Sequence, residues 1–202
     1  MSLQESTLNA VEQFVTAFLN ENLSTSLVFH DIRHTREVVR ASKEIGLHSN
    51  LTPKQLNVVQ IAAWFHDCGY TDVYTGHETL SKKIATDFLI SQSYPADMID
   101  KVNSCIEATR FPQSPRILEA KVICDADLYH FTKPDYHNYE HSLRNELTVY
   151  FKKVYSDEDW ARTNCEMMIN HTYFTDYGKE VLQKFKEVNI ETMRCRFQNK
   201  NQ

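Results

Sequence analysis

Several histidines and acidic residues of this 202-residue chain have a spacing that suits metal binding. His30 and His34 lie four residues apart and therefore share one face of a helix. His66 and Asp67 directly follow the apolar run at residues 61–65, where burying two unpaired polar groups costs several kcal/mol. A divalent cation offsets such a cost, because it binds an imidazole and a carboxylate together. The sequence therefore predicts a metal site at the end of this apolar segment.

A second apolar run, residues 122–128, carries two further acids, Asp125 and Asp127. The same argument applies to it, and the residues alone leave open which of the two acids faces an ion. A His-Asp dipeptide by itself says little, since the chain has one at residues 30–31 and another at residues 66–67. The context of an apolar helix separates the second from the first.

The elements that carry these residues are predicted to be helices. Apolar residues recur at a spacing of three to four, which predicts helices at 5–20, 32–45, 52–68, 77–92, 95–109, 116–130, 136–154, 156–171 and about 177–188. Gly46 and Gly69 are expected to end the second and third helices, and Thr52 with Pro53 to begin the third. Residues 69–76 are expected to be a loop, with breaks at 111–116 and 132–135.

The composition favours one all-α domain over residues 1–202, a bundle of about eight or nine helices. Four glycines and five prolines are too few for the turns of a many-stranded fold. The net charge of −5 supplies no cationic field for a nucleic-acid polymer. No apolar run approaches the roughly 20 residues of a membrane span. The N-terminus has no signal-type segment, so we expect a cytoplasmic protein.

The cysteines fit that compartment. No pair has the C-x-x-C spacing of zinc or redox sites, and we expect reduced, buried side chains. The five are Cys68, Cys105, Cys124, Cys165 and Cys195.

Four segments resemble successive motifs of one superfamily: 29–35 (FHDIRHT), 62–70 (AAWFHDCGY), 76–81 (GHETLS) and 124–128 (CDADL). The order His34, His66-Asp67, Asp127 is similar to the His…His-Asp…Asp pattern of the HD-domain metal-dependent phosphohydrolases. The chain most resembles small bacterial predicted HD phosphohydrolases and the HD part of cyclic-pyrimidine antiphage effectors. The core motifs lie within about residues 25–130. Segments similar to 143–146, 171–175 and 186–189 extend the resemblance into a C-terminal helical extension.

The resemblance implies that His34, His66, Asp67 and Asp127 bind one divalent metal ion. Asp125 is the competing candidate for the last ligand, and Asp127 is preferred because the superfamily's final acid typically follows an alanine. Two imidazoles and two carboxylates suit Mn, Fe, Co or Ni better than the oxygen-seeking Mg, and Zn stays possible.

The resemblance also implies hydrolysis of a small phosphorylated substrate, with a nucleotide as the candidate, by attack of a metal-activated water on phosphorus. Asp67 is expected to help to orient that water. His77 and Glu78 are the candidates for proton transfer to the leaving group. Candidate substrate-binding residues are His30, Arg33, Arg110 and Arg144, with structural anchoring as the alternative for Arg144. Asp31 is expected to cap its helix instead of binding metal.

Departures from better-known relatives keep two alternatives open. Residues 68–72 read CGYTD, without the acid shortly after His-Asp that guanosine-tetraphosphate hydrolases and nucleoside monophosphatases carry. This keeps open a metal-containing nucleotide-sensing or interaction module without turnover. Residues 105–110 lack the further histidines of the cyclic-dinucleotide and di-iron branches, which favours one metal over a di-iron oxygenase. Whether the protein forms a homo-oligomer also stays open.

Overall fold

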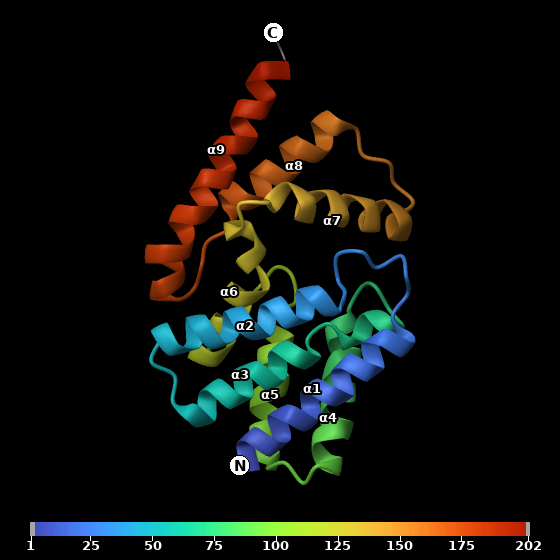
Figure 1. The fold of residues 1–202 in the computed structure, drawn as a ribbon, viewed down its shortest axis with the longest axis vertical. Coiled ribbons are helices and arrows are strands. Elements are labelled where there is room, and N and C mark those ends of the chain that lie inside the picture. The colour runs from blue at the N-terminus through green and yellow to red at the C-terminus, as the bar shows by residue number, and fades with distance from the viewer. Residues whose placement is uncertain (1–2, 201–202) are drawn as a thin grey trace.

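The computed structural model describes residues 3–200 of the chain, and the side chains of residues 6–194. The predicted all-α class is confirmed, since within residues 3–200 the chain forms nine α-helices and no strand (Figure 1). The elements are α1 (Leu3–Asn22), α2 (Ile32–His48), α3 (Pro53–Phe65), η1 (Cys68–Thr71), α4 (His77–Ser91), α5 (Ala96–Ala108), α6 (Leu118–Asp127), η2 (Tyr129–Thr132), α7 (Tyr136–Phe151), α8 (Asp157–Asn170), η3 (Gly178–Leu182) and α9 (Gln183–Lys200). η1 and η2 are 3₁₀ turns, and η3 is a π-helical turn that leads into α9.

Two helix starts that bear on the site follow from capping, as predicted. The Asp31 carboxylate accepts hydrogen bonds from the backbone N–H groups of Arg33 and His34, which fixes the first turn of α2. Thr52 and Gln55 form a reciprocal capping box at the start of α3, with a proline in the first turn. These caps fix where α2 and α3 begin, and thereby help to place His34 in α2 and His66 just after α3.

Two predicted helix ends were wrong. α2 continues through Gly46 to His48. Gly46 instead leaves room for Leu51 and Leu56, since a Cβ at residue 46 would be 2.7 Å from a Leu56 methyl group. α3 ends at Phe65 instead of running to residue 68. Gly69 lies in η1, inside the predicted loop, and its N–H donates to the Ser81 hydroxyl at 2.8 Å. Both glycines therefore serve close packing, and neither is a C-cap.

Three other boundaries also differ. The helix predicted at 116–130 is divided, since α6 ends at Asp127 and η2 follows. α7 ends at Phe151, where Lys152 adopts a left-handed conformation with φ of 51°, instead of at residue 154. The last helix is longer than predicted and reaches Lys200.

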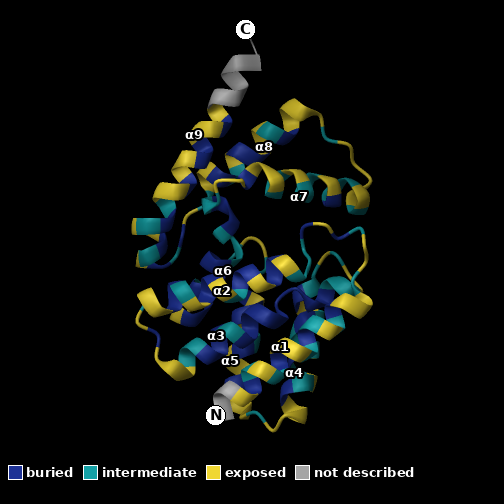
Figure 2. Cartoon of the chain, in the orientation of Figure 1, coloured by how far each residue is buried: buried dark blue, intermediate teal, exposed yellow. Residues whose placement is uncertain are grey.

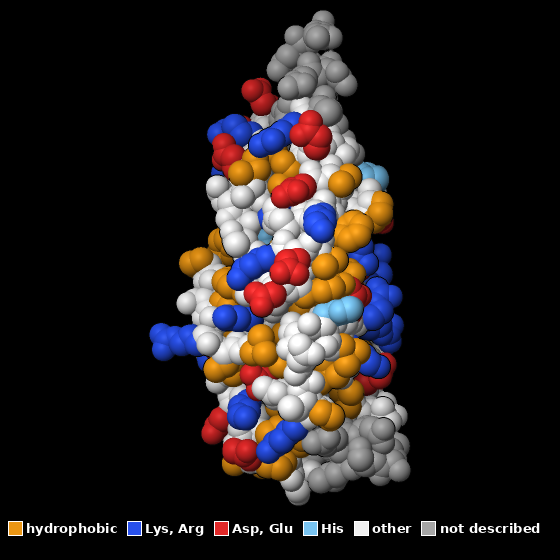
Figure 3. Space-filling model, turned by 90° about the vertical axis from the view of Figure 1, so that its left-hand side faces the viewer, with side chains coloured by type: hydrophobic (Ala, Val, Ile, Leu, Met, Phe, Trp, Pro, Cys, Tyr) orange, Lys and Arg blue, Asp and Glu red, His pale blue; other side chains and the backbone are white. Residues whose placement is uncertain are grey.

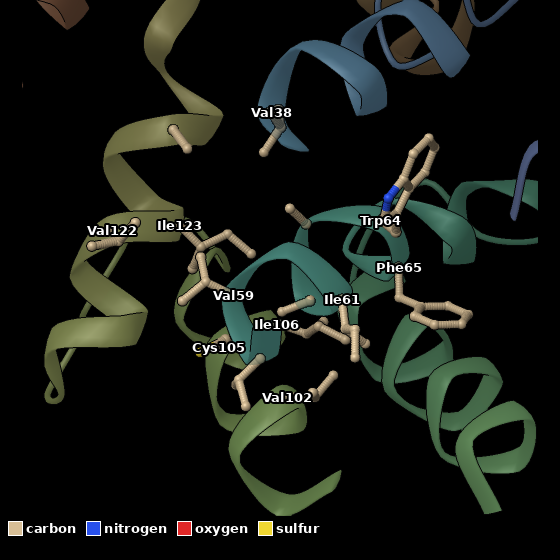
Figure 4. Close-up of a cluster of buried hydrophobic side chains, with 14 of the residues drawn as sticks. Val38, Val59, Ile61, Trp64, Phe65, Val102, Cys105, Ile106, Val122 and Ile123 are labelled. Carbon is tan, nitrogen blue, oxygen red and sulfur yellow. The ribbon is translucent and has the colours of Figure 1, made fainter. Parts of the chain in front are cut away.

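The main hydrophobic core surrounds α3, which is buried along most of its length (Figure 2). Val59, Ile61 and Phe65 of α3 are fully buried against side chains from the neighbouring helices α1, α2, α5 and α6 (Figure 4). Each such side chain contributes roughly 1.5–3 kcal/mol by leaving water. This packing fixes the end of α3, and with it His66 and Asp67.

A second, smaller hydrophobic cluster lies among η2, α7, α8 and α9, in the part of the molecule drawn above α2 in Figure 1. Its buried members are Phe131, Tyr136, Cys165, Met168, Ile190 and Met193. Asn189 of α9 donates to the backbone carbonyls of Phe131 and Lys133, which ties the last helix to η2. The expectation of one domain over residues 1–202 stays a prediction.

The cysteine prediction is confirmed for the four cysteines whose side chains are described, all of which are buried and unpaired. Cys195 lies outside the described side chains.

Among the described residues, no helix is long and apolar enough to span a membrane. Acidic and basic side chains are both present on the face shown in Figure 3.

Candidate functional site

Three helix ends meet at a cluster of two imidazoles and two carboxylates. His34 lies in the first turn of α2, His66 and Asp67 follow α3, and Asp127 ends α6. His34 Nε2 is 3.2 Å from Asp127 Oδ1 and 3.5 Å from Asp67 Oδ2. His66 Nε2 is 3.2 Å from Asp67 Oδ2 and 3.5 Å from Asp127 Oδ1. The ligand atoms of His34, His66 and Asp127 all lie within 4.8 Å of one another.

This cluster has the donor atoms and the spacing of a metal site. Atoms bound to one ion at about 2.0–2.2 Å lie about 3 to 4 Å from each other, and the four His–Asp distances of 3.2 and 3.5 Å are in this range. His66 Nδ1 donates to the Ala63 carbonyl at 2.8 Å, which leaves the lone pair of Nε2 facing the carboxylates. His66 Nε2 and Asp67 Oδ2 are buried without a hydrogen-bond partner. Because buried polar atoms are rarely left unpaired, this pair fits a divalent cation.

The charges of the cluster favour a cation as well. Burial lowers the pKa of His66, but Asp67 and Asp127 raise it more, and the net pKa lies well above its usual value. Burial raises the pKa of Asp67, but His66 lowers it more, and the net pKa lies well below the usual range. One buried carboxylate, Asp67, and one half-buried carboxylate, Asp127, thus demand positive charge beside them, which either protons on the imidazoles or a metal ion supply.

Asp125 and Asp127, the two candidates for the last ligand, point in different directions. Asp127 lies in the cluster, and its Oδ2 accepts from the side-chain amide of Gln113 at 3.3 Å. The fully buried Asp125 accepts from the backbone N–H groups of Phe174 and Thr175 at 2.8 and 2.9 Å and from the Thr175 hydroxyl at 2.7 Å. Burial raises the pKa of Asp125 to about 6. Its contacts assign it to holding the segment before η3.

A small cavity of about 140 Å³ opens beside the cluster. Its wall contains two of the four cluster residues and polar side chains from the starts of α2 and α4 and from the loop after α5. The lining residues are His30, Asp67, Tyr70, His77, Glu78, Thr109, Phe111, Gln113, Asp127 and Leu128.

The sequence matches the protein family described as HD domain over residues 31–132, slightly more than half of the 202 residues. The chain belongs to the HD domain family. No curated protein matches it.

Solved structures share the fold of this HD protein over nearly its whole length. Bacillus subtilis YpgQ, solved in complex with ADP, has a TM-score of 0.71 and 18% identity over 98% of this chain and 97% of its own. The Lin1889 protein of Listeria innocua has a TM-score of 0.69 and 16% identity over 96% and 95%. A predicted HD superfamily hydrolase from an uncultured Thermotogales bacterium has a TM-score of 0.64 and 17% identity over 100% of both chains. At such identities the likeness establishes the fold alone.

His77 and Glu78 are the first two residues of α4 and lie at the edge of the cluster of two imidazoles and two carboxylates. His77 Nε2 is 3.4 Å from Asp67 Oδ1, the carboxylate oxygen that does not face His66. Burial lowers the pKa of His77, but Asp67 raises it more, and the net pKa lies above its usual value. Glu78 is buried, and its Oε2 lies 2.9 Å from Arg110 Nη1. Two of the predicted site residues, His77 and Glu78, are therefore adjacent to the cluster. Arg110 is held by Glu78 but lines another cavity, of about 670 Å³.

The remaining predicted substrate-binding residues lie in different places. His30 lines the cavity. Arg33 has a side chain that is 79% exposed and pairs with Asp31. It lines a second cavity of about 490 Å³ along α2 and α7, which also borders the cluster because His34 is part of its wall. Arg144 binds Asp157 at 2.8 Å and the Tyr155 carbonyl, contacts that fit the anchoring alternative.

Sequence reasoning missed three side chains of the site. Tyr70 lies inside one of the quoted motifs, but its stacking partner His77 is seven residues away and could not be inferred. Gln113 comes from a segment expected only to be a break. Glu146, for which the sequence predicts no role beyond the resembling segment 143–146, accepts hydrogen bonds from the backbone just before α2. For Gln113 and Glu146 the sequence carried no chemical signal, because their partners are distant in the chain.

Proposed function

We propose that this HD protein is a metal-dependent phosphohydrolase that acts on a small phosphorylated molecule of the nucleotide class. The observation that carries the proposal is the convergence of His34, His66, Asp67 and Asp127 beside a small polar cavity. Membership of the HD family supports metal-dependent phosphate-ester chemistry in general.

The proposed metal ligands are these four side chains. Their mixed nitrogen and oxygen set favours Mn, Fe, Co or Ni, with Zn and Mg as less suited ions. When bound, the ion supplies positive charge that polarises the phosphoryl group and favours deprotonation of the attacking water. One oxygen of Asp67 is proposed to bind the ion, and its other oxygen faces His77. The same carboxylate is therefore also proposed to orient the attacking water.

His77 is the proposed proton donor to the leaving oxygen. Its Nε2 faces the cavity side of Asp67, and the raised pKa keeps the imidazole protonated at a higher pH than an isolated histidine. Glu78 lines the cavity and pairs with Arg110, which lies behind it and lines a second cavity of about 670 Å³, so Arg110 is proposed to act on the anionic substrate through Glu78 or outside the small cavity. His30 completes the proposed binding wall. Arg33 and Arg144 stay candidate substrate-binding residues: Arg33 pairs with Asp31 and lines the cavity that His34 borders, and Arg144 pairs with Asp157.

The size of the cavity favours binding of a phosphoryl group, with the rest of the substrate outside. Pockets for whole ligands usually measure roughly 300–1,000 Å³, and this cavity measures about 140 Å³. That YpgQ, a structural relative, was solved with ADP supports a phosphorylated nucleotide as the substrate class.

Phosphate and pyrophosphate release from nucleotides and sugar phosphates in the presence of Mn²⁺, Fe²⁺, Co²⁺, Ni²⁺, Zn²⁺ or Mg²⁺ tests this function. We expect turnover that Asp67→Asn abolishes and that the exposed control Asp72→Asn retains. Nucleotide-dependent thermal stabilisation without any product would instead support the sensing module. Turnover that survives in Asp67→Asn would refute the assignment of the site.

A further inference from the structure

The carboxylate of Glu146, in the middle of α7, is fully buried and receives four hydrogen bonds. Its Oε2 accepts from the backbone N–H groups of Phe29 and His30 at 2.9 and 3.1 Å. Its Oε1 accepts from His30 Nδ1 and, at 2.9 Å, from the Tyr74 hydroxyl. A single side chain from outside the 31–132 HD match thus holds the residues just before α2 and the loop before α4.

Such a carboxylate is firmly placed. Burying an ionised carboxyl group without partners is very costly, whereas hydrogen bonds to a charged acceptor contribute roughly 1.5–3 kcal/mol each. Burial raises the pKa of Glu146, but the bonds from His30 and from the backbone lower it more, so the net pKa is below the usual value. The group is therefore ionised and its four donors are fixed around it.

The consequence for His30 is a defined orientation. Because Nδ1 donates to Glu146, the opposite nitrogen, Nε2, lies on the cavity side of the ring and accepts a long hydrogen bond of 3.4 Å from the Tyr70 hydroxyl. The ring of His30 stacks on Tyr70 with centroids 4.4 Å apart, and Tyr70 stacks on His77 at 3.8 Å. Three stacked rings thus form one wall of the cavity, and Glu146 holds the outer ring.

We propose that Glu146 is a positioning residue, which accepts from Nδ1 of His30 so that the opposite nitrogen, Nε2, takes up a proton from solvent when the anionic substrate binds and donates a hydrogen bond to a phosphoryl oxygen, and that α7 thereby completes the active site of the HD domain. This inference rests on the proposed function. It assigns a role in substrate binding to the C-terminal half, which the HD match does not cover.

Glu44 provides a matched comparison, because it too is a carboxylate that links distant segments. It accepts from the hydroxyls of Tyr129 and Tyr177 at 3.2 and 2.8 Å. None of these three residues lines the cavity. A purely structural role for Glu146 predicts that Glu146→Gln and Glu44→Gln behave alike.

The first test reads the tautomer of His30 by ¹⁵N NMR in the full-length protein, with the His30→Asn variant to assign the signal. We expect a proton on Nδ1 in the wild type and in Glu44→Gln. In Glu146→Gln the amide NH₂ opposes the donors of His30, so we expect the proton to move to Nε2 in a substantial fraction of molecules. An unchanged tautomer in Glu146→Gln would overturn the positioning role.

The second test uses kinetics on the substrate found in the phosphate-release screen. We expect Glu146→Gln to lower kcat/KM by about tenfold to hundredfold, the equivalent of one charged hydrogen bond, and mainly through KM. In the His30→Asn background the same change should have less than a twofold effect, and Glu44→Gln should stay within twofold of the wild type. An undiminished loss in that background would show that Glu146 does not act through His30.

Inorganic phosphate is the probe that separates this inference from the proposed function. Phosphate in the presence of Zn²⁺, a diamagnetic ion, should shift the His30 signal of the wild type but not that of Glu146→Gln, even if no substrate is turned over. A wild type that releases no phosphate from any compound would refute the proposed function alone. A His30 signal that does not respond to phosphate in the wild type would refute the inference.

Discussion

Asp125 and Asp127 are two residues apart on α6, and exchanging each for alanine should produce opposite effects. Asp125→Ala leaves the backbone N–H groups of Phe174 and Thr175 without an acceptor in the interior. Each unpaired buried donor costs about 1–3 kcal/mol, so we expect the free energy of unfolding to fall by about 3 kcal/mol. For a chain of this length that corresponds to a fall in Tm of about 6 to 12 °C.

Asp127→Ala removes a proposed ligand with a side chain that is 19% exposed. We expect metal affinity to fall at least about 100-fold, since loss of even an indirect support of a ligand costs 10–100-fold. In the presence of a chelator its unfolding free energy should fall by only about 1 kcal/mol, the value of one hydrogen bond.

Urea unfolding in chelator and metal titration calorimetry at pH 7.5 measure the two effects on the same preparations. Asp125→Ala should bind the ion within threefold of the wild type once folded. The reasoning fails if Asp125→Ala loses the ion at unchanged stability, or if Asp127→Ala binds it as tightly as the wild type.

Three further outcomes are expected. Gly69→Ala places a Cβ 2.0 Å from the His77 backbone carbonyl. We therefore expect the free energy of unfolding, measured with urea, to fall by about 1–3 kcal/mol. A urea midpoint equal to that of the wild type would contradict the packing. Adding the metal at 100 times its Kd should raise the unfolding free energy by about 2.7 kcal/mol in the wild type but not in His66→Ala, and equal shifts in thermal unfolding would argue against the site. The raised pKa values of His34 and His66 mean that the metal-free protein gains stability from their protonation at low pH and loses it as the pH rises above 6.5. Metal affinity should change in the opposite sense and weaken as the pH falls, because protons compete for the same nitrogens; calorimetry that finds affinity independent of pH between 6 and 8 would refute this.

The amino-acid sequence by itself determined the helical class, most helix starts and the residues from which a metal site can be built. These features are local, because helical periodicity, capping by Asp31 and Thr52, and apolar runs that end in His66-Asp67 or contain Asp127 act over a few residues. The resemblance to HD proteins ordered them into one set, and the HD match spans all four residues of that set.

Only the tertiary structure decided what the polar side chains near those motifs do. Asp125 and Asp127 have the same chemistry and nearly the same position in the sequence, but α6 turns one towards the segment before η3 and the other towards the histidines. Gly69 marks a close approach of η1 to α4, a distance that no local pattern encodes. Glu146 meets His30 across 116 residues of chain. Such contacts depend on how helices pack, and packing is a property of the whole core.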